Sequence, residues 1–115
     1  MIKSFRDLDV YKRSKETYLK LVKATRTFPS EGKHLANQLN RAGNSIHSNI
    51  AEGFGRSNAE FKQYLARALG SNNEVLSHLE DAIALEYLKK DLGQILTDEY
   101  TIVGKQLYRL RENWK

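Results

Sequence analysis

The segment Ser45-Ile46-His47-Ser48-Asn49-Ile50-Ala51-Glu52-Gly53-Phe54-Gly55-Arg56 decides the fold of this 115-residue chain. Its apolar residues recur at the 3.6-residue spacing of a helix, and Gly53 and Gly55 can adopt the positive φ that ends one. Ser57-Asn58-Ala59-Glu60 follows directly and resembles a capping box, with Ser57 as the N-cap. The segment therefore predicts two helices joined by a turn of a few residues.

Working outward, apolar stripes at the same spacing predict four helices, over residues 6–27, 33–53, 57–86 and 90–113. The first ends where Phe28 meets Pro29, because proline disfavours helix in the residue before it. No segment alternates apolar and polar residues long enough for a strand. Short connections make consecutive helices pack in opposite directions. We expect an all-α fold, a single domain over residues 1–115 that forms an antiparallel up-down-up-down four-helix bundle.

The composition excludes several classes of protein. The chain has no cysteine, so a disulfide framework and a thiolate metal site are both impossible. The first residues lack the apolar run of a signal peptide, and nowhere do about 18 apolar residues follow one another. We therefore expect a cytoplasmic protein that does not span a membrane.

Positive charge is concentrated in the first part of the chain. Residues 1–67 hold 13 Lys/Arg and 6 Asp/Glu, a net +7, whereas residues 68–115 hold 6 and 8, a net −2. On the first helix the basic side chains cluster away from the core stripe, and these are the candidate nucleic-acid-binding residues: Lys12, Arg13, Lys15, Lys20, Lys23 and Arg26. Such a surface suits an acidic partner such as nucleic acid, and it equally suits solubility and packing between subunits.

The second helix carries almost no charge. From His34 to Ala51 the only formal charge is Arg41, and the side opposite the apolar stripe is small and polar: Asn37, Asn40, Asn44, His47, Ser48 and Ala51. A solvent-facing helix normally carries Lys and Glu there. Either the bundle itself wraps this helix or a second subunit covers it, and we favour the subunit. Leu8 and Leu19, which lie among the basic residues of the first helix, are further candidate subunit contacts.

No catalytic or cofactor motif is recognisable. A di-iron bundle needs two E-x-x-H motifs, and only Glu31 and His34 match one. Gly53-Phe54-Gly55 lacks the third glycine of a dinucleotide-binding loop and follows a helix instead of a strand. We expect no enzyme, no metal and no cofactor, with His47 on a contact surface and His78 bordering the core.

Three polar residues fall on or beside predicted core faces, where an unpaired polar group is costly: Asn49, Glu52 and Asn72. They could form a small polar site inside the bundle. We favour a structural role, in which they and Arg56 tie down the turn between the second and third helices.

The same central residues carry a family resemblance. Gln38-Leu39-Asn40-Arg41-Ala42, Ser45-Ile46 and Ser48-Asn49-Ile50-Ala51-Glu52-Gly53-Phe54-Gly55-Arg56 resemble the signature of the 23S rRNA intervening-sequence proteins, a bacterial four-helix-bundle family. Further matches are Phe5-Arg6-Asp7-Leu8-Asp9-Val10-Tyr11 and Ala68-Leu69-Gly70-Ser71 with Glu74. The sequence departs from the family pattern at three positions: Asn40 replaces a usual basic residue, His47 replaces a frequent proline, and Glu86 replaces a common glycine. The last of these departures suggests a different third turn.

The resemblance implies a bundle that assembles into a ring-like homopentamer without an established enzymatic activity. Distantly related bundles are accessory proteins of diversity-generating retroelements, where they contact a reverse transcriptase and nucleic acid. This last link is an analogy at the level of the fold. The leading functional expectation is a non-enzymatic oligomeric binding protein that contacts RNA or DNA backbone through the basic surface of the first helix. The alternative is a protein-interaction scaffold with no nucleic-acid role.

Overall fold

The computed structural model describes the whole chain, residues 1–115, as four α-helices without a strand. The helices are α1 (Asp9–Thr25), α2 (Lys33–Gly53), α3 (Asn58–Ala84) and α4 (Lys90–Asn113), with short 3-10 helices at Phe5–Asp7 and Ser30–Gly32. The expected all-α class is confirmed. The bounds of the second and fourth helices agree with the expected ranges.

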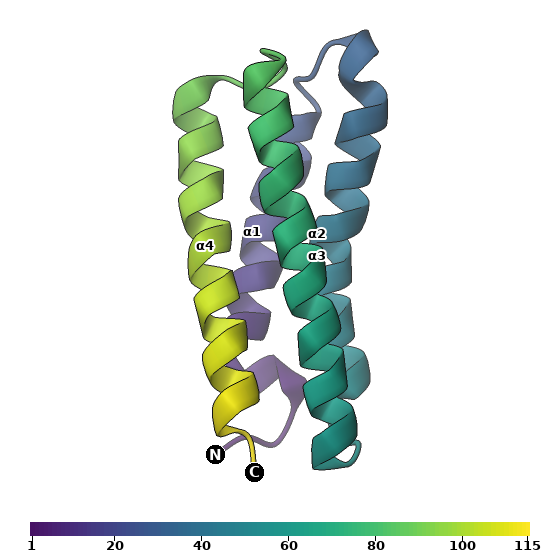
Figure 1. Cartoon of the computed structure of the whole chain (residues 1–115), viewed down its shortest axis with the longest axis vertical. Coiled ribbons are helices and arrows are strands. Elements are labelled where there is room, and N and C mark those ends of the chain that lie inside the picture. The colour runs from purple at the N-terminus through teal and green to yellow at the C-terminus, as the bar shows by residue number, and fades with distance from the viewer.

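The helices form an elongated bundle of 44 × 22 × 19 Å. The N- and C-termini lie at the same end, and each of the three turns reverses the direction of the chain (Figure 1). Each helix packs against its neighbours in sequence, α1 also packs against α4, and the α2–α3 contact is the most extensive. α1 and α3 are therefore diagonal to each other across the core, as are α2 and α4.

The expectation that the first helix begins at Arg6 is wrong. The Ser4 hydroxyl accepts the N–H of Arg6 at 3.2 Å, and the Asp7 carboxylate accepts the N–H of Lys3 at 2.8 Å, so a separate 3-10 helix forms first. The chain is then extended at Leu8. This break turns Leu8 into the core, where it is 4% exposed, so it cannot be the surface contact that we expected.

The turn between α2 and α3 depends on two glycines with different roles. Gly55 has φ of +87°, the positive φ expected of a helix end. Gly53 does not share it: it is the last residue of α2, and a Cβ there would lie 2.5 Å from Cβ of Tyr64. The role predicted for Gly53 is therefore wrong, because what it provides is space for α3 to approach α2.

The same end of the bundle is closed by aromatic rings. Phe61 packs against Trp114, the residue after α4, with ring centroids 4.8 Å apart, and Phe54 lies 5.9 Å from Phe61 in an edge-to-face arrangement. Ser57 caps α3, since its hydroxyl oxygen accepts the N–H of Glu60 at 3.2 Å. Its hydroxyl also donates to the Glu60 carboxylate at 2.9 Å.

At the opposite end, α3 stops at Ala84, two residues before the expected end. Glu86 has φ of 63°, while Tyr87 donates to the carbonyl of Ala82 at 2.9 Å and Glu86 to that of Ile83 at 3.0 Å. These are the two bonds of a Schellman motif. Glu86 thus adopts the left-handed conformation that suits glycine, at a cost of about 1 kcal/mol for a residue with a Cβ.

His47 is buried, which makes its expected place on a contact surface wrong. It is 6% exposed and packs between Tyr18 and Tyr11 of α1, with ring centroids 5.2 and 6.1 Å away. Burial, and secondarily the charge of Lys15, lower the pKa of His47 to about 4. The imidazole is therefore neutral at pH 7 and belongs to the α1–α2 contact.

The polar residues that the sequence grouped, Asn49, Glu52 and Asn72, share no hydrogen bond with one another. Asn72 Nδ2 donates to the backbone carbonyl of Tyr100 at 2.9 Å and ties α3 to α4, not the α2–α3 turn as expected. Asn49 Nδ2 donates to the Ser45 carbonyl within α2 at 2.8 Å. The turn itself is tied by Arg56, whose Nε donates to the Glu52 carbonyl at 2.8 Å. They form no common polar site.

Gly53→Ala should destabilise the bundle. The new Cβ would lie 2.5 Å from Cβ of Tyr64, so the backbones of α2 and α3 would have to move apart, and overpacking of this kind costs about 1–3 kcal/mol. Gly70→Ala is the matched control, because nothing lies within 4 Å of its Cβ position. It should stabilise α3 by about 0.5–1 kcal/mol. Urea unfolding measures both, and a stable Gly53→Ala protein would contradict the close approach of α2 and α3.

Stability should fall as the pH drops from about 6.5 to about 4. Unfolded His47 takes up a proton near pH 6.5, whereas folded His47 resists it until about pH 4. The contribution of neutral His47 to stability is therefore fully present above the pKa of the unfolded state. It is lost as the pH falls towards the pKa of the folded state, and the loss is on the order of 2–3 kcal/mol. Urea midpoints across this range measure the loss. His47→Gln should flatten the decline, and an equally steep decline in that variant would exclude His47 as its cause.

Candidate nucleic-acid interface

The six candidate cations all lie on the outer side of α1. Its inner side buries Val10, Leu21 and Ala24 together with small hydroxyl residues, so helical geometry directs the basic side chains to solvent. Five of the six are exposed and Arg13 is half-buried. At 1.5 Å per residue, Lys12 and Arg26 are about 21 Å apart along the helix. We call this surface the α1 arc, and it consists of Lys12, Arg13, Lys15, Lys20, Lys23 and Arg26.

Within the arc only Lys20 forms an ion pair. Its Nζ lies 3.3 Å from the Glu99 carboxylate of α4, and the same carboxylate accepts the Thr17 hydroxyl at 3.0 Å. Exposed pairs of this kind contribute little to stability. The pair nevertheless neutralises one charge of the arc locally, so Lys20 is the least available of the exposed members.

The end of the arc near the N-terminus is mixed in charge. Lys12 and Arg13 line a shallow hollow of about 280 Å³ together with Asp9, Glu16 and Gln106. The two carboxylates offset the two cations there. None of the five other arc cations forms an ion pair, and Lys15, Lys23 and Arg26 also line no hollow that contains a carboxylate.

The other end of the arc extends onto α2, which the sequence did not indicate. Arg26 lines a hollow of about 290 Å³ with Ser30 and with Lys33, Asn37 and Asn40 of α2. Lys33 adds a cation that was not among the candidates, and the amides and the hydroxyl add hydrogen-bonding groups suited to an oxyanion. The sequence did not predict this proximity, because Lys33 comes close to Arg26 only after the short 3-10 helix Ser30–Gly32 has turned α2 back alongside α1.

The uncharged side of α2 is divided between the bundle and solvent. His47 is buried, and Asn40 is half-buried with its Oδ1 accepting the Thr25 hydroxyl at 3.1 Å. Asn37 and Asn44 are exposed, while Ser48 and Ala51 are partly so. The surface left for a second subunit is therefore a narrower, uncharged strip, with the exposed Arg41 at its border, and the strip consists of Asn37, Asn44, Ser48 and Ala51.

Two other arginines, Arg56 and Arg67, pack on the ring of Tyr64. Arg56 lies 5.0 Å above the Tyr64 ring and 3.8 Å from the Glu60 carboxylate, in addition to its bond to the Glu52 carbonyl. Arg67 lies over the same ring at 4.7 Å. This cluster stabilises the start of α3.

The structure contains no group of three or more His, Cys, Asp or Glu side chains placed to hold a metal ion. Glu31 and His34, the one E-x-x-H match, are both exposed, and His78 is half-buried beside Glu74 at 3.4 Å and Asp81 at 4.0 Å. None of the helices combines the length and the apolar character needed to cross a bilayer.

Comparison with known proteins gives a family and a fold. No curated protein matches the sequence. A crystal structure of a protein with unknown function, from the S23 ribosomal protein family of Bacteroides thetaiotaomicron VPI-5482, is similar with a TM-score of 0.83 and 28% sequence identity. The similarity covers 90% of this chain and 99% of that chain. The model of the 23S rRNA-intervening sequence proteins matches residues 6–109. The resemblance carried by the central motif is confirmed, and the chain belongs to the 23S rRNA-intervening sequence protein family.

Proposed function

We propose that this protein is a non-enzymatic, oligomeric binding protein whose α1 arc contacts the phosphate backbone of RNA or DNA. The observation that carries the proposal is the row of exposed cations on one straight helix, of which only Lys20 is paired with a carboxylate. Lysine and arginine side chains on such a surface neutralise phosphates and release counterions without reading a sequence.

Recognition of unstacked bases is not supported by the arc. Stacking needs exposed aromatic rings, whereas the two tyrosines of α1, Tyr11 and Tyr18, pack against His47. The arc offers phosphates charge, and at the Arg26–Lys33 hollow it adds hydrogen-bonding groups. The proposed ligand contact is therefore to the backbone.

Assembly is part of the proposal, since several copies would multiply a modest charge. We propose that the uncharged strip of α2 forms the contact between subunits of a ring, most simply a pentamer, through Asn44, Ser48 and Ala51, since Asn37 lines the Arg26–Lys33 hollow. Leu19, although 54% exposed, lies four residues from both Lys15 and Lys23 in the α1 arc, so this contact does not include it. Leu8 has no part in this contact because it is in the core.

A protein-interaction scaffold without a nucleic-acid role is the second candidate. The cations of the α1 arc fit an acidic protein surface as well as a phosphate backbone. The two functions differ in whether purified RNA or DNA binds at all, so binding to nucleic acid at low salt separates them.

Charge reversal of the unpaired cations should abolish nucleic-acid binding. The variant Lys15→Glu/Lys23→Glu/Arg26→Glu changes the charge by −6 at positions that face solvent, so the bundle should stay folded. The logarithm of the wild-type affinity should fall linearly with the logarithm of salt, by roughly 0.7–0.9 per phosphate contact. Fluorescence anisotropy with a labelled duplex and a labelled single strand measures both.

The matched control is Lys62→Glu/Lys105→Glu/Lys115→Glu, which makes the same charge change on α3, α4 and the C-terminus. This variant should retain most of the binding. If both variants lose it equally, net charge is responsible and the α1 arc is not the site. If the wild-type protein binds neither RNA nor DNA at low salt, the scaffold replaces the nucleic-acid function.

Glutamate on the uncharged strip of α2 should break the assembly. Asn44→Glu or Ala51→Glu would bury an unpaired charge at the proposed contact, which is strongly destabilising. The mass measured by light scattering on the peak that elutes from a sizing column should then fall to the 13.2 kDa of one chain. Ala66→Glu, at an exposed position of α3, is the control and should leave the mass unchanged. A wild-type mass of one chain at micromolar concentration would refute the assembly.

A further inference from the structure

α4 presents an apolar stripe to solvent. Leu92, Ile95 and Ile102 are 38%, 55% and 41% exposed, and their spacing of three and seven residues places them on one side of the helix. Such positions normally carry polar residues, and isoleucine is a weaker helix former than the Glu, Lys or Gln usual there. Neither the core nor helix propensity explains these three residues, which we call the α4 stripe.

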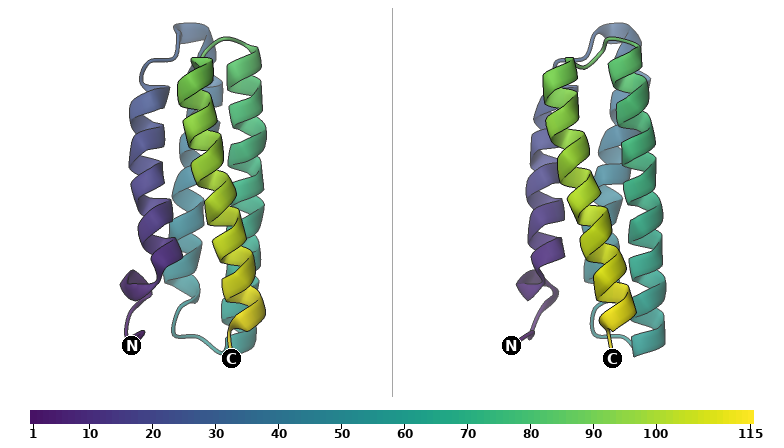
Figure 2. Two further views of the ribbon diagram at one scale, coloured as in Figure 1. Left: turned by 90° about the vertical axis from the view of Figure 1, so that its left-hand side faces the viewer. Right: turned by 60° about the vertical axis from the view of Figure 1, so that its left-hand side comes forward.

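Nothing within the chain covers the α4 stripe. The left view of Figure 2 looks onto α4, with α1 and α3 on its two sides and no element in front of it. Beside the stripe, the Glu99 carboxylate is held by Lys20 and Thr17 of α1. This pairing holds the border between α1 and α4, and the apolar side chains remain open to solvent.

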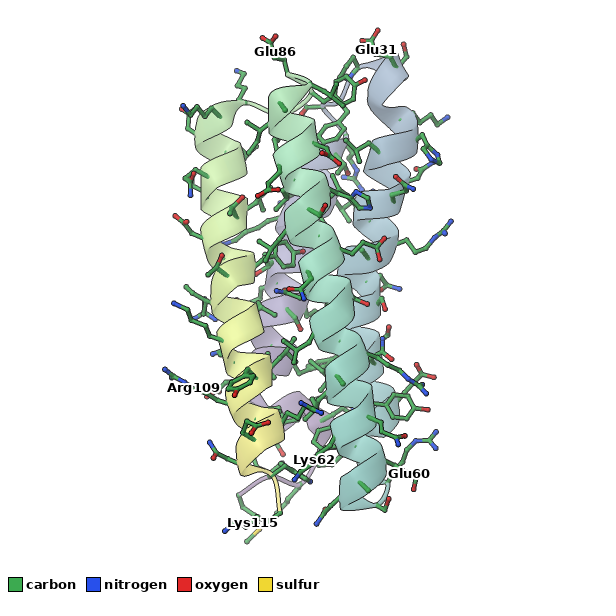
Figure 3. The ribbon with its side chains drawn as sticks, in the orientation of Figure 1. Glu31, Glu60, Lys62, Glu86, Arg109 and Lys115 are labelled. Atoms are coloured by element: carbon green, nitrogen blue, oxygen red, sulfur yellow. The ribbon has the colours of Figure 1, made fainter.

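One border of the stripe, on the side away from α1, is acidic although the chain is basic. Residues 72–101 carry seven carboxylates and two lysines, a net −5 in a chain of net +5, and two of these carboxylates lie next to the stripe. Asp91 and Asp98 are exposed on α4 itself, one residue before Leu92 and three residues after Ile95. In Figure 3, Glu86 lies at the end of the bundle where α3 turns into α4, whereas Arg109 and Lys115 lie towards the other end.

We propose that the α4 stripe is a docking surface for a basic amphipathic helix of another protein. An apolar row bordered by carboxylates is complementary to a helix with an apolar row bordered by Lys and Arg, in the same way that amphipathic helices bind apolar surfaces generally. Packing of the two rows supplies affinity, and the opposite charges select the partner and its orientation.

A second copy of this chain does not offer that helix. On the basic α1 the only large apolar residue that is exposed is Leu19, and on α2 none is exposed. One leucine cannot fill a row of three apolar side chains. The occupant is therefore a different protein. The stripe adjoins the α1 arc only at the Lys20–Glu99 pair, and it is separate from the uncharged strip of α2, which lies diagonally across the bundle.

The probe is an 18-residue synthetic helix with leucines at positions i, i+3, i+4 and i+7 and lysines elsewhere, labelled for fluorescence anisotropy. The wild-type protein should bind it with a micromolar Kd. Ile95→Ser should weaken binding about tenfold, because the interface loses one buried side chain. Leu19→Ser is the matched control at 54% exposure and should change the Kd less than twofold. Circular dichroism establishes that both variants remain folded.

Charge provides an independent readout. Asp91→Asn/Asp98→Asn should reduce the salt dependence of binding, and a probe with glutamate in place of lysine should bind at least tenfold more weakly. The proposal is overturned if the wild-type protein does not bind the lysine probe, if Ile95→Ser and Leu19→Ser weaken binding equally, or if the glutamate probe binds as well. It is also overturned if Ile95→Ser/Ile102→Ser converts an oligomer to a single chain, since the stripe is then a contact between copies.

Discussion

The close approach of α2 to its neighbours is the constraint on which the rest of the bundle depends. At Gly53 a Cβ would meet the Tyr64 side chain at 2.5 Å, so α3 can start beside the end of α2 only because glycine is there. At Gly43 a Cβ would meet Leu21 of α1 at 2.9 Å and the Tyr100 hydroxyl of α4 at 3.3 Å. α2 thus brings the other three helices together at two positions where no side chain intervenes.

α1 packs differently, and this explains why it carries the charges. Its buried face includes Ser14, Thr17 and Thr25, whose hydroxyls lie 2.8–3.1 Å from the carbonyls of Tyr11, Arg13 and Val22. Thr17 and Thr25 share their single hydroxyl proton between that carbonyl and the Glu99 carboxylate or the Asn40 amide oxygen. These bonds satisfy buried polar groups within the helix, so α1 can lie against the core without a wide apolar face. Most of its remaining circumference is free for lysine and arginine. The helix is held by its narrow buried face, by the packing of Tyr11 and Tyr18 against His47, and by the Lys20–Glu99 pair.

The electrostatics separate two surfaces on one small bundle. The α1 arc, extended by Lys33 at the first turn, is positive, whereas the apolar row of α4 has the carboxylates of Asp91 and Asp98 on its outer side. The two surfaces adjoin at the Lys20–Glu99 pair, and the core beneath them is neutral, with Tyr100 raised in pKa by its burial and Asn72 bonded to a backbone carbonyl instead of a charge. The two proposed ligands, a polyanion and a basic protein segment, would therefore contact different side chains.

The sequence by itself determined the features that depend on near neighbours in the chain. The four helices, the N-cap at Ser57, the positive φ of Gly55 and the outward direction of the α1 cations follow from spacing and capping within a few residues. The family also follows, since its motif is contiguous. Much of the candidate site was therefore predictable, whereas Lys33 and the Lys20–Glu99 pair were not.

Only the tertiary structure decided what lies against each side chain. Helical spacing was equally consistent with an outer or an inner place for His47 and for Leu8. His47 is buried because α1 packs over it, and Leu8 is buried because the extended residue before α1 directs its side chain into the core. Lys20 and Glu99 are 79 residues apart, and Asn72 and Tyr100 are 28 apart, so their pairing depends on how two helices meet. Periodicity gives the direction of a side chain on its own helix, but burial and charge compensation depend on the neighbouring helix, which local sequence does not specify.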